Sequence, residues 1–231
     1  MRRYANGPVG EVLKNKLENE GIYPLAFWDN GFKQMTNNKG PLHHPEDFSG
    51  LQFRIMPSEA LHGQFELLGA DDRVETFDQV FPVLNNQQLN AQENTFSNIV
   101  NKNLHSVQDY LTVSNHGYLG YLVLMNKEFW ESLPDEVQIT ILDVLDEVTA
   151  WIQEIAEEVN MAAFEELQMC NCIEIHELTE RERQHWEDVL IPLYMTFKKK
   201  YGELYIQQLP KFNEADFSNI IDDGGENDET E

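Results

Sequence analysis

The alternation of hydrophobic and polar residues changes character near Pro134. Before it, short apolar stretches of strand length alternate with amphipathic helical segments, a pattern that predicts an α/β protein. After it, apolar residues recur every three or four positions from Val137 to Phe164, which predicts one helix of about eight turns, capped by Ser132 or Asp135. Because few globular helices are that long, we expect this helix either to kink or to connect two lobes.

Turn and breaker residues divide the rest of the chain into shorter predicted elements. They are an amphipathic helix over residues 8–20, a strand over 22–28 that closes in an Asn-Gly turn, a strand over 51–56, a helix over 57–70, two separate strand-like runs within 111–126, a strand over 172–178, and a helix over 179–209 divided at Pro192. The final residues, 213–231, are acidic and are predicted to be disordered.

Composition narrows the class of protein. Hydrophobic residues make up 41% of the 231 residues and aromatic residues 11%, too many for a disordered chain. The net charge of −25 argues against binding to nucleic acid or to anionic lipid, since both need a basic face. The N-terminal MRRYANGPVG has a basic start with no apolar stretch behind it, so it is not expected to be a secretory signal.

No catalytic or cofactor-binding motif is present, so neither an enzyme nor a cofactor is predicted. Cys170 and Cys172 are separated by one residue; a bridge between them would be strained and two thiols make an incomplete metal site, so both are expected to be free. A dense polar group precedes the 51–56 strand and raises the question of a metal. It consists of His43, His44, Glu46 and Asp47. Adjacent histidines before a proline do not easily face one ion, so an exposed loop is expected and no metal is predicted.

Arg54 lies within the apolar 51–56 strand, and three interpretations are open for it. It could snorkel from an edge strand, pair with a structural carboxylate, or bind an anion in a cleft. Composition alone favours the structural pair, although a guanidinium also matches a carboxylate bidentately. His116 has two interpretations, since a lone histidine is more often a structural hydrogen-bonding residue than a ligand contact.

A longer stretch favours the anion-binding interpretation. GFKQMTNNKGPLHHPEDFSGLQFRIMPS resembles the segment of DctP-type solute-binding proteins of TRAP transporters that reads roughly G-F-R…T-P-E-D-L-K-G-L-K-I-R-V-P. LLGADDRVETFDQVFPVLNNQQLNAQENTFSNI is similar to their G-A-x-P…F-x-E-V-Y-x-A-L-Q-x-G-V-V-D-G-Q-E-N-P, and SVQDYLTVSNHGY and NKEFWESLPDEVQ follow in family order. Several linked motifs in register over residues 8–210 are more specific than one short pattern.

This resemblance implies a site and a role. The family binds small organic acids, commonly C4-dicarboxylates or sialic acid, between two lobes that close on the ligand, and delivers them to a membrane permease driven by an ion gradient. By resemblance, Arg54 clamps the carboxylate and Asn94 of QEN hydrogen-bonds it. Lys33 falls where many members carry a second arginine, and His116 falls in the cleft region. A periplasmic or extracytoplasmic location follows by the same resemblance.

The resemblance also implies a two-lobed periplasmic-binding-protein fold with an incomplete first lobe. Residues 1–31 and 120–159 correspond to parts of the first lobe with the connecting helix, and 32–119 and 160–212 to the second lobe. Missing strands would leave apolar faces uncovered, which is compatible with self-association. The alternative hypothesis is a truncated relic that no longer transports and acts as a ligand-sensing or interaction protein.

Overall fold

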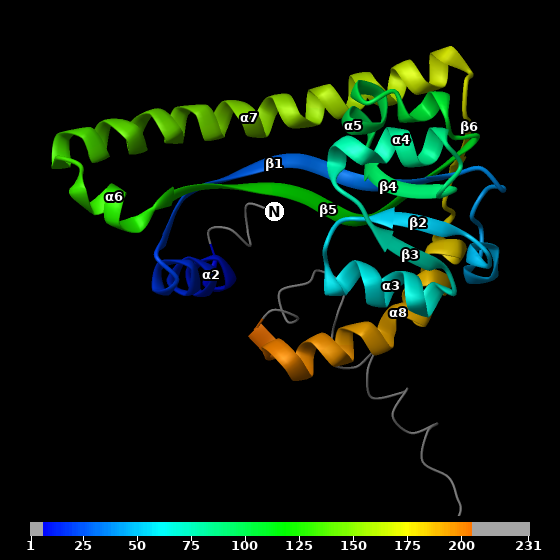
Figure 1. The fold of residues 1–231 in the computed structure, drawn as a ribbon, viewed down its shortest axis with the longest axis horizontal. Helices are drawn as coiled ribbons and strands as arrows, with labels where there is room; N and C mark the ends of the chain where they lie inside the picture. Colours follow the sequence, from blue (N-terminus) through cyan, green and yellow to red (C-terminus); the bar gives the residue numbers. More distant parts are fainter. Residues whose placement is uncertain (1–6, 205–231) are drawn as a thin grey trace, which may run out of the picture.

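One six-stranded mixed sheet organises the chain, which a computed structural model describes over residues 7–204. The strand order is β3–β2–β4–β1–β5–β6 (Figure 1). The strands are β1 (Ile22–Asn37), β2 (Gln52–Ile55), β3 (Asp71–Val74), β4 (Ala91–Thr95), β5 (Tyr110–Asn126) and β6 (Glu174–Glu177). Strand β1 runs antiparallel to β4 and β5, while β2 is parallel to β3 and β4, and β5 is parallel to β6. The predicted α/β class is confirmed.

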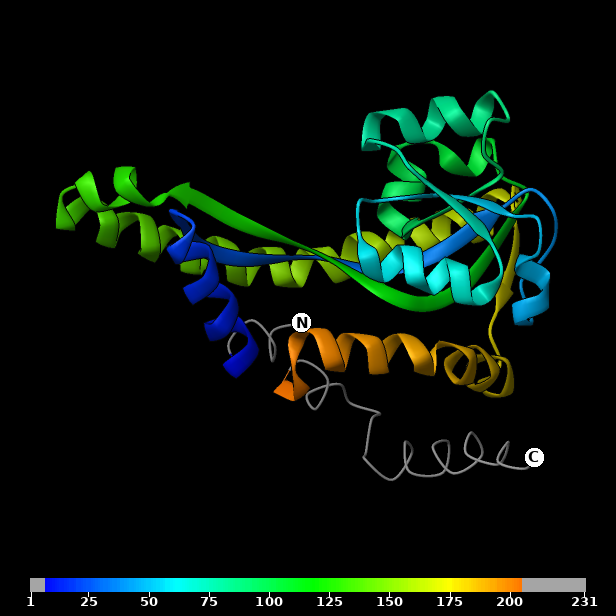
Figure 2. The ribbon, with the colours of Figure 1, turned by 60° about the horizontal axis from the view of Figure 1, so that its bottom comes forward.

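Helices cover both faces of this sheet. The α-helices of the described chain are α2 (Pro8–Asn19), α3 (Glu59–Leu68), α4 (Val80–Asn85), α5 (Phe96–Asn101), α6 (Lys127–Ser132), α7 (Asp135–Cys170) and α8 (Glu180–Tyr201). The short 3-10 helices are η1 (Pro45–Phe48), η2 (Phe77–Gln79) and η3 (Leu104–Ser106). In Figures 1 and 2, α4, α5 and α7 lie on one side of the sheet and α3 and α8 on the other. None of the helices among residues 7–204 combines the length and apolar character that crossing a bilayer requires.

The molecule has two parts that differ in how many layers of secondary structure they contain. We call residues 32–119 and 160–204 the body and residues 7–31 and 120–159 the extension. In the extension, β1 and β5 continue out of the body as a two-stranded ribbon beside α7, with α2 and α6 at its far end (Figure 1). Both buried hydrophobic clusters consist of body residues. The domain boundaries expected from the sequence remain a prediction, and residues 205–231, including the acidic tail, lie outside the described residues.

Two strand predictions are wrong in the same way. Asn30 and Gly31 form no turn, because β1 continues through them to Asn37 and neither residue has the positive φ that an Asn-Gly hairpin turn needs. Gly31 instead allows close approach of α7, since a Cβ there would lie 2.8 Å from Nδ2 of Asn160. The two runs within 111–126 are likewise one strand, β5, which pairs with β1 along its length through register shifts.

The long helix is one continuous element, and two details of the helix predictions are wrong. The N-cap of α7 is Pro134, with no capping side chain, so neither Ser132 nor Asp135 caps it. Helix α8 continues through Pro192 instead of dividing there. Next to this proline the helix packs closely on α3, because a Cβ at Gly63 would lie 2.6 Å from Cδ1 of Leu193. A proline removes one helical hydrogen bond, and the helix tolerates that loss here.

The two cysteines form a disulfide, contrary to the prediction that both are free. Helix α7 ends at Cys170, and Asn171 takes the left-handed conformation with φ of 49°. That turn brings Cys172 back toward the helix end, with 5.2 Å between the two Cα atoms, which lies in the normal range for a disulfide.

Candidate functional site

Arg54 is buried in the body and is held by main-chain oxygen. Its side chain extends from the central part of β2, and the residue is only 2% exposed. Nε and Nη2 both donate to the carbonyl oxygen of Glu75, at 2.9 and 2.6 Å. Arg54 therefore does not snorkel to solvent, and among residues 7–204 it does not form the structural ion pair that composition favours. Burial lowers its pKa, while the charges of Glu93 and Glu75 act in the opposite direction.

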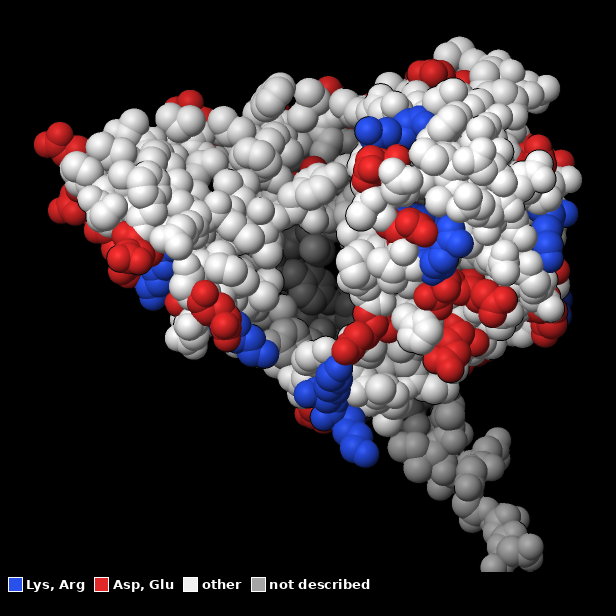
Figure 3. Space-filling view, viewed as in Figure 1, with Lys and Arg blue, Asp and Glu red and all other residues white. Residues whose placement is uncertain are grey.

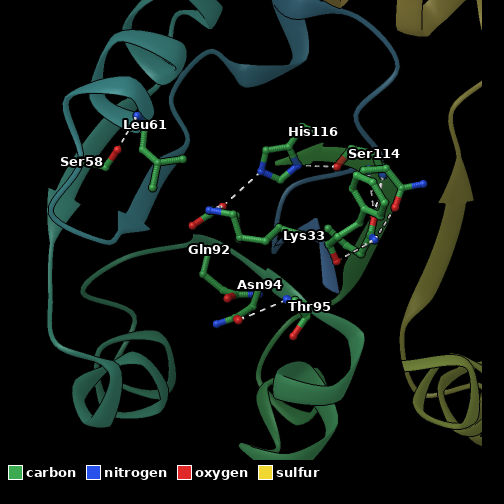
Figure 4. A network of polar contacts seen from close by, with 12 residues as sticks. Lys33, Ser58, Leu61, Gln92, Asn94, Thr95, Ser114 and His116 are labelled. Atoms are coloured by element: carbon green, nitrogen blue, oxygen red, sulfur yellow. Dashed lines mark hydrogen bonds and ion pairs between the residues drawn. The ribbon is translucent and has the colours of Figure 1, made fainter. Parts of the chain in front are cut away.

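Lys33 and His116 meet at one buried carboxylate, that of Glu93. The Lys33 ammonium forms an ion pair with Oε2 of Glu93, and Nε2 of His116 lies 3.2 Å from the same oxygen. Their side chains are 7%, 4% and 0% exposed for Lys33, His116 and Glu93. Ser114 lies on the other side of the ring, with Oγ 2.7 Å from Nδ1 of His116 (Figure 4). A carboxylate with two nitrogen partners can stay ionised in this interior.

The direction in which each pKa is shifted indicates which groups of this network are charged. Burial would raise the pKa of Glu93, but the hydrogen bond with His116 and the charge of Lys33 lower it below its ordinary value. Burial lowers the pKa of His116, against the opposing effect of Glu93. The ring is therefore neutral at pH 7, which suits a Ser114 hydroxyl donating to Nδ1 and an Nε2–H donating to Glu93. Lys33 and Glu93 are then the charged pair.

Asn94 lies at the end of β4, where the chain enters α5. The residue is 4% exposed, and its Oδ1 accepts from the N–H of Thr95 at 3.1 Å (Figure 4). The same oxygen accepts from Nδ2 of Asn98 at 2.7 Å. Within residues 7–204, no hydrogen-bond acceptor receives the N–H groups of the Asn94 amide. The carbonyl end is thus fixed by the protein and the amine end is available as a donor.

The strand register divides the four predicted residues between the two faces of the sheet. Arg54 of β2 is paired with Gln92 of β4. Side chains alternate along a strand, so Asn94, two positions after Gln92, lies on the same face of the sheet as Arg54. Glu93 points to the other face, where it contacts Lys33 and His116. The structure thus brings Lys33 and His116 together at Glu93, and the charge of Glu93 also acts on Arg54.

Glu93 and Ser114 are the residues of this network that the sequence analysis missed. The signal for Glu93 was present in QEN, because three polar residues in succession within a strand flanked by apolar segments need buried partners. Oε1 of Glu93 and Oε1 of Gln92 are fully buried and have no hydrogen-bond partner among the described residues. Both oxygens can therefore accept a hydrogen bond from a donor that the described chain does not supply.

Two hollows accompany this network. The space-filling view shows one between the part of the chain that carries α2 and α6 and the part that carries α3 and α4 (Figure 3). A cavity of about 850 Å³ lies between β1, β5 and α7, and its lining includes Asn30, Gln34, Tyr118 and Asn160. The four predicted site residues are not among the residues that line this cavity.

Comparisons with known proteins agree on one family. The model of the DctP family, described as bacterial extracellular solute-binding protein family 7, matches residues 1–200. The C4-dicarboxylate-binding protein DctB of Bacillus subtilis is 38% identical over 209 residues, which cover 90% of this chain and 60% of that protein. The C4-dicarboxylate-binding periplasmic protein DctP of Rhodobacter capsulatus is 40% identical over 202 residues, or 87% of this chain and 60% of that protein.

Solved structures give the same result. A TRAP periplasmic solute-binding protein of Shewanella oneidensis with bound succinate superimposes with a TM-score of 0.86 at 36% identity, covering 89% of this chain and 67% of that one. The predicted similarity to two-lobed TRAP binding proteins is confirmed. The chain spans about 60% of the length of the curated relatives it matches.

Proposed function

Because the chain belongs to the bacterial extracellular solute-binding protein family 7, the DctP family, we propose that it binds a small organic acid by its carboxylate. It acts outside the cytoplasm as the solute-binding subunit of a TRAP-type transporter, and it hands the ligand to the membrane permease subunits. Its work is capture and release, without chemical change of the ligand. Relatives named as periplasmic binding proteins support the location.

The observation that carries this proposal is how Arg54 is held. Its Nε and Nη2 are used by one carbonyl oxygen, and within the described residues Nη1 has no hydrogen-bond partner. The Nη1–Nη2 edge of the guanidinium therefore still offers two parallel N–H groups, the arrangement that a carboxylate accepts bidentately. Anchoring through main-chain oxygen fixes the guanidinium without neutralising it, so its positive charge stays available.

The neighbouring groups supply charge and donors. The charges of Glu93 and Glu75 act on Arg54, while Lys33 pairs with Glu93 on the opposite face of the sheet. Among these side chains Arg54 supplies the charge that attracts an anion, and Lys33 offsets the charge of Glu93. The free amine end of Asn94 shares a sheet face with Arg54 and adds a neutral donor. His116 contributes by fixing Glu93, and so positions Lys33.

C4-dicarboxylates are the ligand class to test first. Two relatives that cover most of this chain are named C4-dicarboxylate-binding proteins, and one similar structure contains succinate. The same comparisons favour a binding protein over the alternative of a relic with a sensing or interaction role. An acid with a hydroxyl group has a further possible contact, since the buried oxygens of Glu93 and Gln92 lack donors among the described residues.

The test is calorimetry with succinate and L-malate on the full chain, its Arg54→Lys variant and an Arg73→Lys control. Arg73 is paired with Arg54 in the β2–β3 ladder, but its side chain is 44% exposed and pairs with Glu75. Arg54→Lys keeps the charge and loses the planar fork, so we expect affinity to fall by at least about tenfold. The control should bind as the unaltered chain does.

Two results would contradict the proposal. One is the absence of saturable binding of either acid by the unaltered chain when circular dichroism shows that it is folded. The other is equal affinity for the unaltered chain and Arg54→Lys, which would remove Arg54 from the site while leaving the binding role intact.

A further inference from the structure

Three side chains far apart in the sequence converge within the body, and none of them belongs to the proposed carboxylate site. They are His43 in the loop before η1, His176 on β6 and Glu182 in the first turn of α8. One ligand atom from each lies within 4.8 Å of the others. Nδ1 of His43 is 2.7 Å from Oε1 of Glu182, Nε2 of His176 is 3.3 Å from Oε2, and the two imidazole rings lie 4.0 Å apart.

Each of the three residues is held in place by its own backbone contacts. The His43 N–H donates to Oδ2 of Asp47 at 2.8 Å, and its carbonyl accepts from Nε1 of Trp186 at 3.1 Å. His176 lies in β6 within the β5–β6 ladder. Glu182 completes the capping box of α8 with Thr179. Such fixed surroundings are what a preorganised ligand set requires.

The bonding of these groups favours a cation. Oε2 of Glu182 accepts hydrogen bonds from the N–H and the hydroxyl of Thr179 at 2.7 and 2.8 Å, and Oε1 faces Nδ1 of His43. Nε2 of His176 is buried and, among the described residues, makes no hydrogen bond in spite of its closeness to Glu182. An unpartnered imidazole nitrogen beside a carboxylate is a donor pair that suits a metal.

We propose that His43, His176 and Glu182 bind one divalent transition-metal ion of the Zn²⁺ class. Two imidazoles and one carboxylate are a common protein ligand set for Zn²⁺, with water in the remaining position. Bonds of about 2.0–2.1 Å place tetrahedral ligand atoms about 3.4 Å apart, close to the 3.3 Å between Nε2 of His176 and Oε2 of Glu182. The 2.7 Å between Nδ1 of His43 and Oε1 of Glu182 would widen when an ion enters between them. The His43 side chain is 42% exposed, so solvent and the ion can reach the site.

A bound ion would join the 38–44 loop, the edge strand β6 and the start of α8. The site shares no residue with the network around Arg54 and Glu93, so this proposal does not depend on the proposed ligand. An ordinary hydrogen bond between His43 and Glu182 is the competing explanation, and it accounts for neither the nearby His176 ring nor its unpartnered nitrogen.

The experiment is a titration of the metal-stripped full chain with Zn²⁺ by calorimetry and with Co²⁺ by visible absorption. The variants are His43→Gln and His176→Gln, and the matched control is His62→Gln. His62 also has Nδ1 2.7 Å from a carboxylate oxygen, that of Asp72, but within the described part of the chain it belongs to no group of three potential ligands. We expect one saturable site, d–d absorption typical of a four- or five-coordinate ion, and at least about a tenfold loss of affinity in both test variants.

The control should bind as the unaltered chain does. Absence of saturable binding by the unaltered chain would overturn the proposal, and so would binding that survives His43→Gln unchanged. His43 is a partly exposed loop residue, so that variant decides the matter even if His176→Gln fails to fold.

Discussion

The body and the extension share two long strands and one long helix, but they bury them to different degrees. In the body, the last five residues of β1 are all buried, whereas in the extension β1 is mostly half-buried. Helix α7 shows the same contrast: Ala163 and Leu167 are buried, but Ile139 and Trp151 are 58% and 59% exposed. An apolar pattern therefore specifies an element, and burial depends on the layers that surround it.

The candidate site lies where this change occurs. Lys33 is the first residue of the buried run of β1, and Gly117, next to His116, is its partner in β5. A Cβ at Gly117 would lie 3.0 Å from Cε of Lys33, so the glycine gives the lysine stem room to reach Glu93. The polar network thus occupies the point at which the ribbon enters the layered body.

Removing a large side chain from each region should give the largest difference. Phe53 is fully buried, and its ring stacks on that of Phe65 with centroids 4.1 Å apart. We expect Phe53→Ala to lower the free energy of unfolding by about 4 kcal/mol. Trp151→Ala in the extension should change it by less than about 0.5 kcal/mol, because that side chain is mostly solvated. Urea unfolding measures both, and equal losses would refute the division into two parts.

A smaller effect is expected from removing one charge of each kind of ion pair. Glu93→Gln leaves Lys33 buried without a counter-ion, which should lower the free energy of unfolding by about 3 kcal/mol. The matched change is Glu18→Gln in the extension, where Glu18 and Lys127 are 3.4 Å apart and about one third exposed. Its effect should stay below about 1 kcal/mol because solvent screens the pair.

Urea unfolding of the two variants compares their losses in the free energy of unfolding. A loss for Glu93→Gln no larger than that for Glu18→Gln would mean that water or another group replaces the carboxylate. The network would then not be closed to solvent, and its role in holding Lys33 would be wrong.

Local signals predicted those elements that local chemistry determines. Helix α3 begins at a Ser58 cap whose side chain accepts from the N–H of Leu61, and it ends at Gly69 with φ of 79°. Both signals are readable in the sequence, as is the periodicity of α7. The continuity of β1 through Asn30-Gly31 was not readable, because it depends on pairing with β5 and on the approach of Asn160 from α7.

The candidate sites also differ in whether a contiguous sequence pattern identifies their residues. Arg54 and Asn94 could be identified from motifs because each lies within a contiguous pattern. Their roles in binding, with those of Lys33 and His116, stay predictions. The group of His43, His176 and Glu182 had no such signal, since more than a hundred residues separate its first member from the others. His43 stood beside His44 in a pattern that argued against a metal, and only the fold supplies its actual neighbours.

The smallest effect we expect is a dependence of stability on pH that separates buried from exposed histidine. The pKa of His116 is lowered in the folded chain from an ordinary value of 6.5, chiefly by burial. Below pH 6.5 the His116 side chain binds a proton in the unfolded chain but not in the native chain. The stability that His116 contributes is therefore present above pH 6.5 and is lost as pH falls toward the lowered pKa. His62 is the opposite case, because its hydrogen bond with Asp72 raises its pKa.

Urea unfolding at about pH 7.5, 6.5 and 5.5 distinguishes the two histidines. The stability difference between the unaltered chain and His116→Gln should shrink on acidification, as the buried neutral ring is penalised. The corresponding difference for His62→Gln should be present at low pH and shrink as pH rises through the raised pKa, because the protonated ring is the form that Asp72 stabilises. If both differences moved in the same direction, His116 would be charged in the native chain, and the neutral ring that connects Ser114 to Glu93 would be wrong.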